Sequence, residues 1–227
     1  MNRSNAEIVH EYGPFPGTER VSGVTYDGQL VWFGSGDRLN AFDPSTGNLV
    51  RTIDVGAHAG TAFDGRYLFQ ITEGSIHKID PKTGEVLATI PAPGGGGDSG
   101  LAWAEGTLWV GQYRERKIHQ IDPETGAILR TIESNRFVTG VNWVDGELWH
   151  ATWEGEESDL RRVDPQTGEV VETLDLPDGV LGSGLDTDGG DRFFCGGGTS
   201  GEGRAGRGPR GGGAGWCPKR GGVSGGG

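Results

Sequence analysis

The sequence predicts an all-β fold: a five-bladed β-propeller of four-stranded blades, closed by an N-terminal strand. The turn Asp-Pro-x-Thr-Gly occurs four times, and its copies start 37, 42 and 42 residues apart, at Asp43, Asp80, Asp122 and Asp164. A repeat of this length is typical of solenoids and propellers. The inner strands are expected to begin at a small residue followed by glycine, in five places: Ser22-Gly23, Ala59-Gly60, Ser99-Gly100, Thr139-Gly140 and Ser183-Gly184. The five pairs indicate five blades, the last of which lacks the Asp-Pro turn.

Each unit is expected to contain four short strands in a fixed order. The inner strand follows the small residue and glycine, because glycine lets several strands crowd a narrow axis. An acid-glycine pair such as Asp64-Gly65 then forms a two-residue hairpin turn. The third strand ends at the Asp-Pro turn, and the fourth alternates as an outer strand does, as in Leu49 to Ile53. The second strands are aromatic or branched and are expected at Leu30 to Phe33, Tyr67 to Ile71, Leu108 to Val110, and Leu148 to Trp149.

The fifth unit is irregular and is expected to borrow a strand from the start of the chain. Its first two strands are predicted at Gly184 to Asp186 and Arg192 to Cys195. Gly203 and Gly206 then stand where other blades have isoleucine, which predicts a weak third strand. Glu7 to Tyr12 is similar to the outer strands of other units, and its addition would remove exposed sheet edges. We expect the propeller to span residues 1–206 and the Gly/Arg-rich residues 207–227 to form a disordered tail.

Composition excludes several classes of partner. The net charge is −12, which argues against binding to nucleic acid or to an anionic membrane surface. No apolar stretch approaches the ~20 residues of a membrane span, and the polar opening residues lack the core of a secretory signal. We therefore expect a cytoplasmic monomer in which Cys195 and Cys217 are free thiols.

Function is expected at the face that carries the irregular loops, because the acid-glycine and Asp-Pro turns occupy the other face. These irregular segments include Pro14 to Arg20, Gly34 to Arg38, Gln112 to Lys117 and Gly197 to Glu202. His58 and Asp98 occupy the same place in their units, just before the small residue and glycine. They are candidates for a proton-transfer pair or for ligands of a divalent cation, Ca²⁺ or Mg²⁺. The alternative is that they are loop residues bonded to backbone amides.

A second group of candidates comprises an acid and several aromatic residues. Glu73 follows a second strand and could act as a general base if burial raises its pKa. The acids Glu154, Glu156, Glu157 and Asp159 are instead expected to form a solvated surface. Four aromatic residues could wall a ligand pocket or could pack between blades: Trp103, Tyr113, Trp143 and Trp153.

The segment Gly140 to Trp149, continuing through Trp153 to the turn at Asp164, resembles a blade of the plant and bacterial glutaminyl-peptide cyclotransferases. Leu68 to Thr72 is similar to another of their second strands. The repeated part is also similar to quinoprotein-like, lactonase-like and streptogramin-lyase-like propellers. The resemblance implies a five-bladed propeller that cyclises an N-terminal glutamine with loss of ammonia, using an acid and aromatic residues. It adds Gln70 and Asn142, which lie in the matching segments, as candidates for substrate binding.

The chain departs from that family in its first blade. The family carries Phe-Thr-Gln-Gly on the inner strand and a glutamate on the second strand, where this chain has Arg20 to Gly23 and Trp32 to Ser35. We therefore expect a small-molecule or peptide ligand at the irregular face and little or no cyclotransferase activity. The alternatives are a divalent-metal-dependent hydrolase or lyase at the channel mouth, and a propeller that binds without catalysis.

Overall fold

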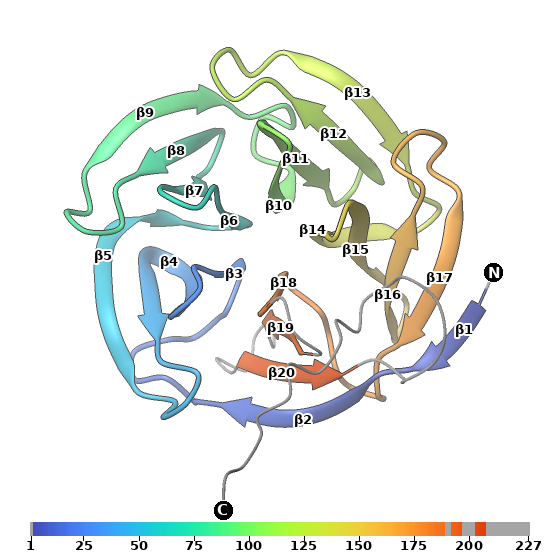
Figure 1. Cartoon of the computed structure of the whole chain (residues 1–227), viewed down its shortest axis with the longest axis horizontal. Coiled ribbons are helices and arrows are strands. Elements are labelled where there is room, and N and C mark those ends of the chain that lie inside the picture. The colour runs from blue at the N-terminus through green and yellow to red at the C-terminus, as the bar shows by residue number, and fades with distance from the viewer. Residues whose placement is uncertain (1, 189–191, 197–202, 208–227) are drawn as a thin grey trace, which may run out of the picture.

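The computed structural model describes residues 2–188, 192–196 and 203–207, which form five β-sheets around a central axis (Figure 1). The predicted five-bladed propeller is confirmed. The predicted loop at Gly197 to Glu202, the tail from residue 208 and Cys217 lie outside the described residues. The innermost strands are β3 (Val24–Tyr26), β6 (Thr61–Phe63), β10 (Asp98–Ala104), β14 (Phe137–Val144) and β18 (Leu185–Thr187).

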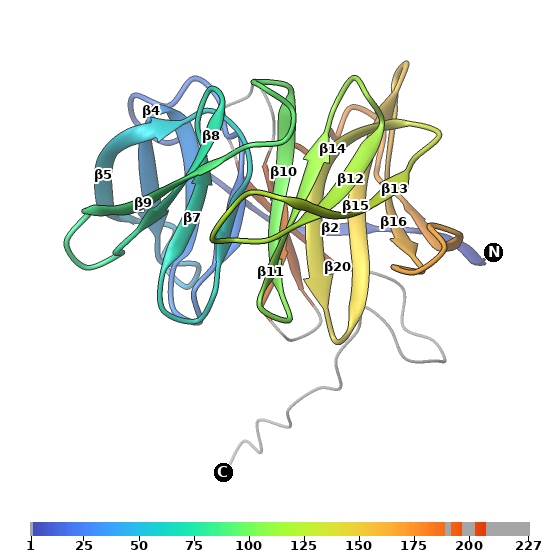
Figure 2. The same cartoon turned by 90° about the horizontal axis from the view of Figure 1, so that it is seen from above.

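Blades 2 and 3 have the predicted order of four antiparallel strands. Blade 2 adds β7 (Leu68–Ile71), β8 (Ser75–Ile79) and β9 (Val86–Pro91) to its inner strand, and blade 3 adds β11 (Thr107–Gln112), β12 (Lys117–Ile121) and β13 (Ile128–Glu133). Seen from the side, the turns that join β10 to β11 and β14 to β15 (Glu147–Glu154) lie on the same face of the ring (Figure 2).

In blade 1 a single element takes the second and third strand positions. The first part of β4 (Val31–Phe42) pairs with β3, and its last part pairs with β5 (Leu49–Ala57). We expected an irregular loop from Gly34 to Arg38, but strand structure continues through it. Gly36 has a φ of 61°, a left-handed conformation that glycine adopts without strain.

Blade 5 is closed by the N-terminal part of the chain, as predicted. Its sheet contains β18, β19 (Phe193–Gly196), β20 (Gly203–Arg207) and β2 (Glu7–Tyr12). The β2 strand pairs antiparallel with β20, from Glu7 opposite Arg207 to Tyr12 opposite Gly203. Tyr12 is buried, and its hydroxyl donates to the Pro44 carbonyl 3.1 Å away in the next blade. The start of the chain therefore ties the last blade to the first.

Blade 4 carries a fifth strand that the sequence analysis did not predict. It contains β14, β15 (Glu147–Glu154), β16 (Glu157–Val163) and β17 (Val170–Asp175), and β1 (Asn2–Asn5) pairs in parallel with β17. The Arg3 guanidinium donates to both carboxylate oxygens of Asp175, at 2.7 and 3.0 Å. The N-terminal segment thus contacts blade 4 before it becomes the outer strand of blade 5.

The Asp-Pro turns are held by the aspartate that begins each of them. In the third copy, Asp122 Oδ1 accepts the backbone N–H groups of Glu124 and Thr125 at 2.9 and 2.8 Å. These bonds favour the ionised carboxylate, so the pKa of Asp122 is lowered. Gly126 closes the turn with a φ of 76°, and a side chain at this position would collide with the Pro91 carbonyl of the preceding blade. The repeated turn therefore positions each blade against the one before it.

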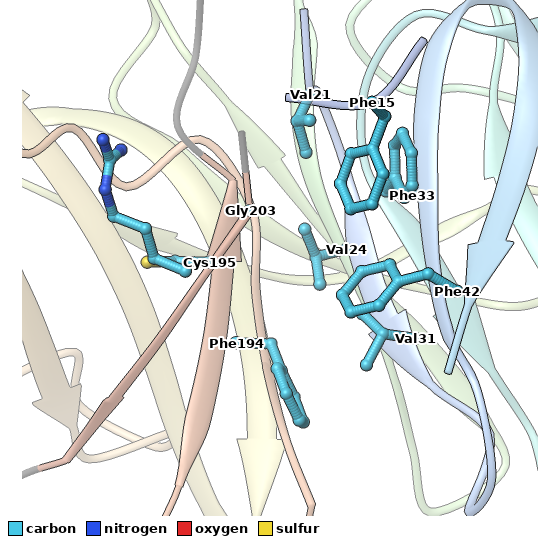
Figure 3. A pocket seen from close by; sticks show the side chains of 10 residues that line it. Phe15, Val21, Val24, Val31, Phe33, Phe42, Phe194, Cys195 and Gly203 are labelled. Atoms are coloured by element: carbon cyan, nitrogen blue, oxygen red, sulfur yellow. The ribbon is translucent and has the colours of Figure 1, made fainter. Parts of the chain in front are cut away.

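The core consists of aromatic and branched side chains packed between neighbouring blades. Trp32, Trp109 and Trp149 are buried, as expected for packing between blades. Cys195 is a buried free thiol, and burial raises its pKa to about 12. A small apolar cavity of about 10 Å³ lies between blades 5 and 1, where the rings of Phe15 and Phe33 stack with centroids 4.8 Å apart (Figure 3). The described residues contain no helix long and apolar enough to cross a membrane.

Candidate functional site

A cavity of about 720 Å³ lies on the propeller axis, at the end where the inner strands begin. Every blade contributes to the wall the small residue that precedes the glycine at the start of its inner strand: Ser22, Ala59, Ser99, Thr139 and Ser183. The glycines that follow allow this arrangement, because a side chain on Gly60 or Gly100 would collide with the next inner strand. The irregular loops complete the wall, so the cavity opens at the predicted functional face.

Asp98 lines this cavity, but its carboxylate is directed toward protein donors. The Gly94 N–H donates to both Asp98 oxygens at 3.0 Å, and the Gln112 side chain also hydrogen-bonds to the carboxylate. Desolvation raises the pKa of Asp98 despite these bonds. Its contacts match the alternative of a loop residue bonded to a backbone amide.

His58 also lines the cavity, and its side chain is 40% exposed. His58 Nε2 lies 3.9 Å from a carboxylate oxygen of the exposed Asp37. Within the described ranges, no three His, Cys, Asp or Glu side chains come together as a metal site. Binding of Ca²⁺ or Mg²⁺ by His58 and Asp98 stays a prediction.

An aromatic wall forms at the side of the cavity next to blades 3 and 4. Tyr113 and Trp153 line the cavity, and their ring centroids are 6.3 Å apart. Phe137 stacks on Tyr113 with centroids 4.8 Å apart, and the Arg116 guanidinium lies over the Phe137 ring. The structure therefore places two of the four predicted aromatic candidates at the cavity.

The other two aromatic candidates, Trp103 and Trp143, line a separate cavity of about 110 Å³ among the inner strands. Trp103 stacks on Phe69, and Trp143 stacks on Trp109, with centroids 5.2 and 5.5 Å apart. Both contacts match the alternative of packing between blades.

The same 110 Å³ cavity contains Asn142 and Asp186. Asn142 Oδ1 accepts the Trp143 N–H at 2.8 Å. Asp186 accepts the Thr25 hydroxyl and the Tyr26 N–H, each at 2.6 Å, and burial raises its pKa to about 6. Sequence reasoning missed Asp186, because it is an acid on a predicted inner strand with no motif around it.

Gln70 and Glu73 do not line the axial cavity. The Gln70 side chain is fully buried and fully bonded: it accepts the Thr61 hydroxyl at 2.6 Å and donates to three backbone carbonyls. Glu73 is exposed at the end of β7. Trp103 and Trp143 do not line the axial cavity either.

The acidic loop of blade 4 is not simply a solvated surface, contrary to expectation. Asp159 is buried and accepts from Arg161 at 2.9 Å, from the Thr152 hydroxyl, and from Arg136 at 3.3 Å. Burial and the nearby Arg161 also lower the pKa of His150 to about 4, so this imidazole is neutral near pH 7. The sequence pattern did not reveal this network, because it depends on Arg136, which comes from the segment before β14, as well as on Arg161 two residues along β16.

Three cavity residues were not singled out from the sequence. Arg20 and Arg114 line the cavity, and each lies in a segment that we had identified as irregular. Thr139 also lines it, and its hydroxyl oxygen is buried without a hydrogen-bond partner among the described atoms. The irregularity of the loops was the signal, but it did not identify the residues.

The comparisons with known proteins agree with this architecture. The family described as "Domain of unknown function (DUF5074)" matches residues 48–185, and no curated protein matches the sequence. The fold is similar to a glutaminyl cyclase from Myxococcus xanthus, with 18% identity and a TM-score of 0.76, covering 91% of this chain and 97% of that one.

Two more distant structures share the architecture. The WD40 β-propeller domain of Doa1 has 17% identity and a TM-score of 0.53, covering 81% of this chain and 62% of that one. Hydrazine synthase from Kuenenia stuttgartiensis has 19% identity and a TM-score of 0.50, covering 80% and 58%. At these identities the similarity confirms the propeller fold, which the sequence predicted to be like that of the glutaminyl cyclases. It does not extend to an activity or a ligand.

Proposed function

This chain belongs to the family described as a domain of unknown function, DUF5074, and we propose that it binds a small molecule or a peptide in the axial cavity. The observation that carries the proposal is the cavity itself, about 720 Å³ in volume, to which all five blades contribute. Cavities of about 300–1,000 Å³ with apolar walls and a few polar groups are the usual sites for small ligands. Tyr113 and Trp153 supply such a wall here, and Ser22 and Thr139 supply polar groups.

Binding without glutamine cyclisation is the function that we favour. In blade 1, Ser22 stands where the plant and bacterial glutaminyl-peptide cyclotransferases carry glutamine, and Phe33 stands where they carry an acid. Phe33 is buried and stacks on Phe15, so this position offers no group that could transfer a proton. Glu73, the acid considered as a proton shuttle for that reaction, is exposed and lies outside the cavity wall.

A thermal-shift screen of small molecules and short peptides, followed by calorimetric titration of the hits, tests the binding proposal. Trp153→Ala removes part of the wall and is expected to weaken binding of a hit about tenfold, as loss of a buried aromatic contact does. Leu129→Ala on the exposed outer strand is the matched control and should leave affinity unchanged. Hits that bind Trp153→Ala as tightly as the parent would place the site elsewhere.

A coupled ammonia assay on a peptide that begins with glutamine tests the reaction separately. We expect no ammonia release above background from the parent protein or from Glu73→Gln. Release by the parent that Glu73→Gln abolishes would establish a cyclotransferase with Glu73 as the shuttle. Release that survives Glu73→Gln would establish the activity and refute that residue's role.

A further inference from the structure

Two arginines at the axial cavity have no ion-pair or hydrogen-bond partner among the described residues, although the chain has an excess of acids. The charged and ionisable side chains that line the cavity are Arg20, His58, Asp98 and Arg114. Arg20 and Arg114 are exposed, and in the described part of the chain neither side chain makes an ion pair or a hydrogen bond. Seven other described arginines pair with a carboxylate within 3.3 Å: Arg3, Arg116, Arg136, Arg161, Arg162, Arg192 and Arg204. In a chain of net charge −12, these two guanidinium groups are uncompensated positive charge at the cavity.

The acid in the same cavity does not neutralise them. Both Asp98 oxygens accept the Gly94 N–H, and the Gln112 side chain also hydrogen-bonds to the carboxylate. Asp98 is also only 8% exposed, so its charge faces the loop rather than a ligand. Glu154, which lies near the aromatic wall, is paired with Arg116 at 3.2 Å.

The rest of the wall fits a ligand with an apolar body. Arg114 directly follows Tyr113, whose ring forms the aromatic wall together with Trp153. Arg20 lines the same cavity from the segment that precedes the inner strand of blade 1. The buried hydroxyl of Thr139, which has no partner among the described atoms, offers one more donor inside the cavity.

We infer that the ligand of the axial cavity is an organic anion: a carboxylate held by Arg20 and Arg114, with an aromatic or apolar body against Tyr113 and Trp153. The inference rests on the proposed binding function and adds the chemical class of the ligand. Arginine suits this role because its planar guanidinium donates two parallel hydrogen bonds to a carboxylate. The walls of a cleft also strengthen attraction between its charges and an ion of opposite sign.

Matched probes that differ only in charge test the inference by calorimetric titration of the full chain. The probes are 3-phenylpropionate, neutral 3-phenylpropionamide and cationic 3-phenylpropylamine, with indole-3-acetate and indole-3-acetamide as a second pair. We expect each carboxylate to bind at least tenfold tighter than its amide and to lose affinity as salt is raised.

Arginine variants then separate the charge from the cavity. Arg20→Gln and Arg114→Gln should each weaken carboxylate binding about fivefold or more and leave amide binding unchanged. Arg66→Gln is the control, because Arg66 lies over the Tyr67 ring, away from the cavity wall. All three variants should melt as the parent does, since the side chains removed are exposed.

The outcomes distinguish the two proposals. If the amide or the amine binds as tightly as the carboxylate, or if Arg66→Gln weakens binding as much as the cavity variants do, the anion inference is wrong while the binding site stands. If no probe of any charge binds, both proposals fail.

Discussion

The two glycines of β20 should respond in opposite ways to the same substitution, although both stand where other blades carry isoleucine. Neither has a positive φ, so alanine fits the backbone at both positions. A Cβ on Gly206 would overlap the Phe193 ring, with Cε2 at 2.6 Å and Cε1 at 2.8 Å. A Cβ on Gly203 would meet only the Phe15 ring and the Tyr12 Cβ, both at 4.0 Å, beside the small cavity of Figure 3.

The magnitudes follow from this packing. Phe193 is fully buried, so Gly206→Ala must displace a ring from a packed core, which costs about 1–3 kcal/mol. Gly203→Ala removes backbone freedom from the unfolded chain without a clash and stabilises by about 0.4–1 kcal/mol. For a domain of this size each kcal/mol shifts Tm by roughly 2–4 °C. We therefore expect Gly206→Ala to lower Tm by roughly 2–12 °C and Gly203→Ala to raise it by roughly 1–4 °C.

Thermal and urea unfolding of the two variants measure this difference, and a double mutant identifies the cause. Phe193→Leu in the Gly206→Ala background should recover part of the loss, giving a coupling of at least about 0.5 kcal/mol. A Gly206→Ala variant as stable as the parent, or a double mutant whose losses simply add, would refute the account in which the Phe193 ring fills the place of a β20 side chain.

Three further predictions concern closure, pH and metal. Deletion of Met1 to Gly13 removes β2 and should abolish a cooperative melt, whereas deletion of Asn2 to Asn5 removes only β1 and should lower Tm modestly. A longer deletion that melts as the parent does would contradict closure by β2. Burial raises the pKa of Asp186 to about 6, above its unfolded value of 3.8, so its contribution favours folding at low pH and is lost as pH rises through 6. Asp186→Asn should flatten this part of the curve of unfolding free energy against pH, and an unchanged curve would disprove the burial effect. If His58 and Asp98 hold a divalent cation, Ca²⁺ or Mg²⁺ at about 100 times Kd should add about 2.7 kcal/mol of stability that His58→Ala removes, and a Tm indifferent to metal and chelator would rule the cation out.

The fold was predictable because its signals are local. An Asp-Pro turn or a small-residue and glycine pair sets backbone conformation within a few residues, so counting these pairs predicted the number of blades. The closing role of Glu7 to Tyr12 followed from its similarity to the other outer strands, and β2 confirms it. The parallel strand β1 was missed, because residues 2 to 5 carry no apolar alternation that would indicate a strand.

The candidate site was predictable only in its location. The irregular loops and the position of His58 and Asp98 predicted a site at the channel mouth, where both residues lie. Trp103 and Trp143 line a different cavity from Tyr113 and Trp153. Trp103 and Trp143 lie beside the turns that join β10 to β11 and β14 to β15, whereas Tyr113 and Trp153 lie at the opposite ends of those hairpins, so the position along the strand decided which cavity each ring lines.

By itself, the sequence determined the repeat and the number of blades, since each depends on residues close together in the chain. It also indicated closure of the ring, because Glu7 to Tyr12 is similar to the other outer strands. Only the tertiary structure decided which side chains meet. Arg20 and Arg114 share one cavity because the ring brings blades 1 and 3 to a common axis, and the buried Asp159 pairs with Arg136, which comes from the segment before β14. Such contacts join residues that are distant in sequence, and no local preference encodes them.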